Sequence, residues 1–140
     1  MSAGERPYRV LFIDDDVYML ELISMVLESE GFDVVLAANG QEGKAAMLDR
    51  AQQPPFDVIM VDLMMPVMDG LRFLHWLRKD AESRIPVLVL TGRCGTDIVE
   101  AVKQAGGDVL LFKPIDASKI VAQLRLLLPS LSSPDLTPQG

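Results

Sequence analysis

Apolar residues along this chain fall into two alternating patterns, short uninterrupted runs and longer stretches with helical spacing. The runs, such as YRVLFI and FDVIMVD, are rich in Val, Ile, Leu and Phe, as is typical of strands buried on both faces. Turn residues bound most of them. We predict five strands, at residues 8–13, 32–37, 56–62, 85–91 and 108–112.

Between the runs, apolar residues recur every three or four positions. Leu20, Ile23 and Leu27 fall on one helical face, while Glu21 and Glu28 fall on another. This spacing predicts five amphipathic helices, at about residues 17–30, 39–50, 71–80, 96–105 and 116–128. Strands alternating with such helices indicate an α/β fold, a doubly wound parallel sheet with helices on both faces.

Several polar residues and glycines mark where helices begin and end. Asn39 and Glu42 have the spacing of a capping box. Gly31 is placed to end the first helix. We interpret Asp16 as a helix cap and Asp69 as a cap in the turn before Gly70.

Length and composition limit the class of protein. The chain has 140 residues and a net charge of −7, which fits one domain and disfavours a general nucleic-acid-binding surface. Its single cysteine, Cys94, excludes an internal disulfide and a cysteine-rich zinc site. We predict an extension at 1–7, a folded domain at 8–128 and a Pro/Ser-rich tail or linker start at 129–140. Without a signal peptide or apolar span, we expect a soluble, cytoplasmic protein.

Polar side chains gather where the predicted strands end. Asp14, Asp15 and Asp16 follow the first strand, while Asp62, Thr91 and Lys113 stand at the ends of the third, fourth and fifth. In an open α/β sheet, ligands bind at the carboxyl ends of the strands. Carboxylates that converge there repel one another, and a hard divalent cation removes that repulsion. The pattern therefore predicts a Mg²⁺ site that binds a phosphoryl group, with one carboxylate as a candidate nucleophile.

Four motifs in order, VLFIDDD, VDLMMPVMDG, VLVLTG and AGGDVLLFKPI, resemble the receiver domain of two-component response regulators over residues 8–128. The resemblance implies a flavodoxin-like sheet with strand order 2-1-3-4-5. It implies that Asp62 accepts the phosphoryl group and that Thr91 and Lys113 contact it. It also implies a cis bond between Lys113 and Pro114.

The same resemblance implies the metal ligands. They are Asp15 directly, Asp14 directly or through water, Asp62 and the backbone carbonyl of Met64. Mg²⁺ is the expected ion, and Mn²⁺ is expected to substitute for it.

The resemblance also implies partners. A histidine kinase or phosphotransfer protein would donate the phosphoryl group, and an output domain, effector or second copy would bind the face around residues 96–128. Such a domain is a signalling switch rather than an enzyme with a metabolite substrate. We expect neither direct nucleic-acid nor membrane binding.

Two features modify the expected switch. Leu110 stands where receivers commonly carry Tyr or Phe, so the aromatic part of the switch is missing. Met64 and Arg93 stand two residues beyond Asp62 and Thr91, in positions that by resemblance flank the attacking water. Apolar Met64 offers that water no hydrogen bond, so we expect slow loss of the phosphoryl group.

An alternative is a Mg²⁺-dependent phosphatase of the haloacid dehalogenase type, with Asp14 as nucleophile. Asp14 and Asp16 form its Asp-x-Asp pattern, but Asp62 would have no role. The phosphorylated aspartate distinguishes the two hypotheses. A flavodoxin-like binding fold without phosphoryl chemistry leaves the carboxylates unexplained. We interpret Met65, His75 and Trp76 as packing or surface residues.

Overall fold

A computed structural model of the chain describes residues 6–52, 54–65, 67–93 and 95–128. Its five strands are β1 (Arg9–Ile13), β2 (Asp33–Ala37), β3 (Val58–Asp62), β4 (Val87–Thr91) and β5 (Val109–Phe112). All neighbouring strands are parallel, in the order β2-β1-β3-β4-β5. The predicted α/β class and strand order are confirmed. The predicted tail at 129–140 and most of the extension at 1–7 lie outside the described residues.

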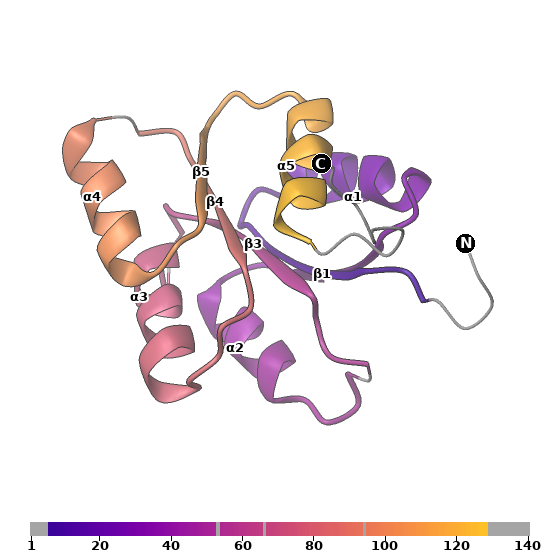
Figure 1. The fold of residues 1–140 in the computed structure, drawn as a ribbon, viewed down its shortest axis with the longest axis horizontal. Helices are drawn as coiled ribbons and strands as arrows, with labels where there is room; N and C mark the ends of the chain where they lie inside the picture. Colours follow the sequence, from indigo (N-terminus) through magenta and orange to yellow (C-terminus); the bar gives the residue numbers. More distant parts are fainter. Residues whose placement is uncertain (1–5, 53, 66, 94, 129–140) are drawn as a thin grey trace, which may run out of the picture.

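The helices cover both faces of the sheet (Figure 1). They are α1 (Val17–Ser29), α2 (Gly40–Leu48), α3 (Gly70–His75), α4 (Thr96–Ala105) and α5 (Ala117–Leu127). α3 continues directly into a π-helical turn, η1 (Trp76–Asp80). Side chains of α1 and α5 pack with one face of the sheet, and side chains of α3 and α4 pack with the other. No helix in the described part of the chain is long and apolar enough to cross a membrane.

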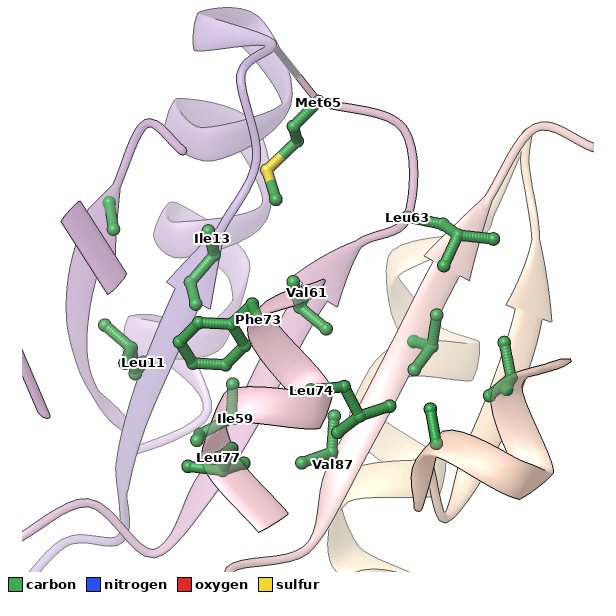
Figure 2. Packing of buried hydrophobic residues seen from close by; sticks show 14 of the residues in the cluster. Leu11, Ile13, Ile59, Val61, Leu63, Met65, Phe73, Leu74, Leu77 and Val87 are labelled. Carbon is green, nitrogen blue, oxygen red and sulfur yellow. The ribbon is translucent and has the colours of Figure 1, made fainter. Parts of the chain in front are cut away.

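Alternation along the strands divides the core in two. Leu11, Ile13 and Ile59 point to the α3 side, while Val10 and Phe12 point to the α1 side. On the α3 side, Figure 2 shows the Phe73 ring lying against β1 and β3. The central strands β1, β3 and β4 are buried along their whole length, as predicted. β2 and β5 are the edge strands and are partly exposed, so the expectation of two buried faces is wrong for them.

Most predicted helix signals have the expected role. The Asp16 carboxylate accepts hydrogen bonds from the N–H groups of Tyr18 and Met19, and Asp69 accepts one from Arg72. Gly31 has a φ of 95°, which a side chain rarely adopts, so glycine suits this helix end.

The predicted capping box at the start of α2 forms in part. Asn39 Oδ1 accepts from the Glu42 N–H at 2.8 Å, as expected. Glu42, however, accepts from the N–H of Ala38 rather than that of Asn39. The return bond is therefore displaced by one residue toward β2.

One end of the sheet is held by arginines. Arg9 is almost completely buried, and its guanidinium donates to Asp33, Gln52 and the Pro54 carbonyl. Arg6, in the predicted extension, donates two hydrogen bonds to Asp57, at 2.8 and 3.0 Å. These bonds fasten the start of β1 to the segment before β3, at the end of the strands opposite to Asp14 and Asp62.

Candidate functional site

Four strands place the predicted site residues at one edge of the sheet. Asp14 directly follows β1, Asp62 ends β3, Thr91 ends β4 and Lys113 directly follows β5. Backbone hydrogen bonds continue the sheet into this edge, because Asp14 N donates to Ala37 O at 3.0 Å and Lys113 N donates to Thr91 O at 2.7 Å. The side chains therefore stand on ordered backbone that belongs to the sheet.

Three carboxylates converge at this edge. Each of Asp14, Asp15 and Asp62 offers an oxygen, and these oxygens all lie within 4.8 Å of one another. Asp14 is fully buried and Asp62 nearly so, while Asp15 is exposed. Asp16 N donates to Asp14 Oδ1 at 2.9 Å, which fixes the Asp14 carboxylate. Asp16 itself caps α1, as predicted, and is not part of this cluster.

Lys113 supplies the positive charge nearest to the buried carboxylates. Its Nζ lies 3.1 Å from Asp14 Oδ2 and 3.4 Å from Asp62 Oδ1. The peptide bond between Lys113 and Pro114 is cis, as the resemblance implies. One ammonium thus faces two buried carboxylates, which leaves excess negative charge at the edge of the sheet.

The pKa values reflect this excess. Burial, and then repulsion from Asp14, raise the pKa of Asp62 to about 6 in spite of Lys113. Burial likewise raises the pKa of Asp14, against the hydrogen bond from Asp16 and the charge of Lys113. Burial lowers the pKa of Lys113, but Asp14 and Asp62 together outweigh it, so that pKa is raised and the side chain is an ammonium.

These groups fit a hard divalent cation. The possible ligand atoms are carboxylate oxygens at two strand ends, and two of the three carboxylates are buried. The raised pKa of Asp62 indicates that Lys113 alone does not balance the negative charge there. Mg²⁺ prefers oxygen ligands and is commonly held by one or two carboxylates. A bound cation would remove the repulsion that raises the pKa of Asp62.

The loop after Asp62 is held close to the site. Met64 N–H donates to the Asp62 carboxylate, while half of the Met64 side chain is exposed. Gly70 N donates to Leu63 O at 3.0 Å. A Cβ at Gly70 would lie 2.6 Å from Asp62 O, so this contact requires glycine. Neither spacing nor resemblance predicted the hydrogen bond from Met64 N–H, and the Met64 carbonyl remains a predicted metal ligand.

Thr91 is fully buried, and its Oγ1 accepts from Arg93 N at 3.0 Å. Among the described residues, this hydroxyl has no hydrogen bond to Asp14, Asp62 or Lys113. The Arg93 side chain is exposed. Thr91 is therefore at the predicted edge of the sheet, but its contact with the other site residues is not made in this structure.

Leu110, the residue at the predicted switch position, lies on β5 beside Val89 of β4. It is half-buried and packs against the apolar cluster that contains Ile98 and Val102 of α4. Met65 is buried in the same cluster, as expected for a packing residue. His75 is exposed, and Trp76 is half-buried beside Phe73.

Comparisons with known proteins agree with this geometry. The family described as "Response regulator receiver domain" matches residues 10–125. The chain is 38% identical over 126 residues to the probable transcriptional regulatory protein TcrX of Mycobacterium tuberculosis, covering 90% of this chain and 52% of that protein. It is 35% identical over 127 residues to the CpxR homolog of Haemophilus influenzae, covering 90% and 52%.

Solved structures show the same fold. The chemotaxis protein CheY4 of Vibrio cholerae superposes with a TM-score of 0.78 at 31% identity, covering 87% of this chain and 99% of that one. The receiver domain of the Francisella response regulator 1452 gives a TM-score of 0.74 at 32% identity, covering 86% and 95%.

The strand order and the acidic edge define a flavodoxin-like domain with a site suited to a divalent cation. The chain belongs to the response regulator receiver domain family, whose members are signalling modules of two-component systems. The phosphatase alternative receives no support from any of these matches. The chain spans about half the length of the curated relatives it matches.

Proposed function

We propose that Asp62 accepts a phosphoryl group from a histidine kinase or a histidine phosphotransfer protein. The observation that carries this proposal is the position of Asp62 at the end of β3. There its carboxylate lies 3.4 Å from Lys113 Nζ and within 4.8 Å of Asp14 and Asp15. Asp14 has the same neighbours, but its Oδ1 already accepts a hydrogen bond from Asp16 N, and the family resemblance assigns the phosphoacceptor role to Asp62.

The proposed step is a phosphoryl transfer. An Asp62 carboxylate oxygen bonds to phosphorus, the bond from phosphorus to the donor imidazole nitrogen breaks, and the electron pair leaves with that nitrogen. Asp14, Asp15, Asp62 and the Met64 carbonyl would hold Mg²⁺, or Mn²⁺ in its place, which neutralises the charge of the phosphoryl oxygens. The Lys113 ammonium and the Thr91 hydroxyl would bind the remaining phosphoryl oxygens.

The module we propose is a switch without a metabolite substrate of its own, working in the cytoplasm. Its partners would be the phosphoryl donor and an output partner, or a second copy, at the face of α4, β5 and α5. Several relatives are named DNA-binding response regulators. Because this chain spans about half of them and has a net charge of −7, we propose that this chain does not itself bind DNA.

The test is phosphorylation of the full chain by acetyl phosphate with Mg²⁺, followed by mass spectrometry of the intact protein and its peptides. We expect one phosphoryl group on Asp62, and none when Mg²⁺ is chelated or in Asp62→Asn. Asp80→Asn, which removes an exposed carboxylate outside the cluster, should be labelled like the wild type. Labelling at Asp14, or unchanged labelling of Asp62→Asn, would refute the proposal.

A further inference from the structure

A polar pocket lies between α2 and the α3–η1 segment. Its volume is about 320 Å³, and Lys44, Arg72, His75, Trp76 and Lys79 are among its lining residues. The pocket's lining includes none of the residues of the candidate phosphoryl site, which are Asp14, Asp15, Asp62, Thr91 and Lys113. It is therefore a separate site, and the phosphoryl chemistry proposed above does not use it.

The pocket gathers cations that have no carboxylate partner. In the described part of the chain, the ion pairs of lysine and arginine involve Arg6, Arg9, Arg78, Lys113 and Arg125. Lys44, Arg72 and Lys79 are in none of these pairs, yet all three line this one pocket. Among the described residues that line the pocket, Asp80 is the only one with a carboxylate. Such a local concentration of positive charge in a chain of net charge −7 favours binding of an anion in this pocket.

Helical geometry brings these groups together. Arg72 lies on α3 and Lys79 lies in η1, and the α3–η1 segment brings both to the pocket. The π-helical turn begins between them, and Ala81 N donates to Trp76 O at 2.9 Å across it. π-helical turns are rare in proteins, and those that occur often lie at functional sites. α2 packs against α3 and adds Lys44 from the other side.

Trp76 gives the pocket a flat apolar wall. The Trp76 ring is half-buried and its centroid lies 5.8 Å from that of Phe73. Lys44 Nζ lies over the face of the Trp76 ring, 5.3 Å from its centroid. The Trp76 indole N–H makes no hydrogen bond to any residue in the described ranges. An aromatic face beside guanidinium and ammonium groups binds a planar ring and an attached phosphate at the same time.

We propose that this α2–α3 pocket binds a small phosphate-bearing molecule with a planar ring, of the nucleoside monophosphate class. Arg72, Lys79 and Lys44 would hold the phosphate, and Trp76 would contact the ring. The volume lies at the lower end of the range of small-molecule sites. The net negative charge of the rest of the chain disfavours an extended polyanion such as a nucleic acid.

The test uses the full ¹⁵N-labelled chain and AMP, without divalent cations so that the acidic cluster does not take up the phosphate. The chain has one tryptophan, so one indole N–H resonance reports on the pocket. We expect AMP to shift this resonance and the amides of Arg72 and Lys79 saturably, while the amide of Leu63 beside Asp62 stays in place. Inorganic phosphate and adenosine should each bind at least about tenfold more weakly than AMP.

Charge-matched variants separate the pocket from the general surface. Arg72→Gln with Lys79→Gln should weaken AMP binding by about tenfold or more, because two charge-assisted contacts are lost. Lys103→Gln with Lys119→Gln, which removes two exposed cations of α4 and α5, should leave it unchanged. Equal weakening in both variants, or no saturable shift, would overturn the proposal. Tighter binding of a short oligonucleotide or an acidic peptide at these residues would overturn the assignment to a small molecule.

Discussion

Val67, in the loop after Asp62, has a φ of 70°. A β-branched side chain is strained in this left-handed region, whereas asparagine tolerates it. Because Val67 is 73% exposed, replacing it removes little packing. We expect Val67→Asn to raise the free energy of unfolding by about 1 kcal/mol in urea denaturation. Val99→Asn, at an exposed valine inside helix α4, should show no such gain, and an equal gain there would contradict the strain argument.

The raised pKa of Asp62 makes stability depend on pH. Its carboxyl has a pKa of about 6 in the folded protein, against 3.8 for an unperturbed aspartate. The folded state therefore binds the Asp62 proton more tightly than the unfolded state does. The stability that this proton adds is lost as the pH rises from about 4 to about 7. In the absence of Mg²⁺, the free energy of unfolding of the wild type relative to Asp62→Asn should fall by about 2–3 kcal/mol over that range. If the difference in free energy of unfolding between the wild type and Asp62→Asn stayed constant or grew with pH, the raised pKa of Asp62 would be contradicted.

Arg78 joins η1 to its neighbours. Its guanidinium donates to the carbonyls of Ser83, Ile85 and Gly106, and to Asp108. Removing these donors leaves part-buried carbonyls without partners, so Arg78→Met should lower the free energy of unfolding by about 2–3 kcal/mol. The matched variant is Lys79→Met, one position further along, whose side chain is exposed. It should change stability by less than about 0.5 kcal/mol, and similar losses in both variants would refute the role of Arg78.

We expect the phosphorylation switch to involve β5 and α4. Leu110 packs with the side chains of α4 but has no ring to move inward and no hydroxyl to form a hydrogen bond. We therefore expect the phosphoryl mimic beryllofluoride with Mg²⁺ to produce a modest change of hydrogen exchange, centred on the loop after Thr91 and on α4. Exchange that changes strongly in α1 or α2 while α4 stays silent would place the output face elsewhere.

Across the whole molecule, a cation held by the acidic cluster should stabilise the fold. A ligand that binds only the native state raises the unfolding temperature, and here it also relieves repulsion among Asp14, Asp15 and Asp62. We expect Mg²⁺ to raise the thermal midpoint of the wild type and of Asp80→Asn. Asp15→Ala should lose most of this increase, and should be at least as stable as the wild type without metal. A full Mg²⁺-dependent increase in Asp15→Ala would show that Asp15 is not a ligand.

The alternation of apolar runs and helical spacing was sufficient to predict the sheet, its helices and the edge at which the site lies. Each of these features depends on local pattern. Other features depend on partners that are distant in the sequence. The run YRVLFI includes Arg9, whose burial requires Asp33, Gln52 and Pro54.

The site residues were predicted, but some of the contacts that they make were not. Spacing and resemblance led to Asp14, Asp15, Asp62 and Lys113, which the fold brings together. Neither indicated that Thr91 Oγ1 would accept from Arg93 N, or that the helix after Gly70 would widen into a π turn. Both features are set by how the chain packs after the strands are in place.

The complete burial of β1, β3 and β4, set against the partial exposure of β5, has a consequence for timescales. Segments with few buried contacts open often and briefly, whereas fully buried central strands open only when most of the domain unfolds. Asp14 directly follows the buried strand β1 and Asp62 ends the buried strand β3, while Lys113 follows the partly exposed strand β5. The two carboxylates therefore keep their relative positions through local fluctuations. The lysine that faces them follows the strand that opens more readily.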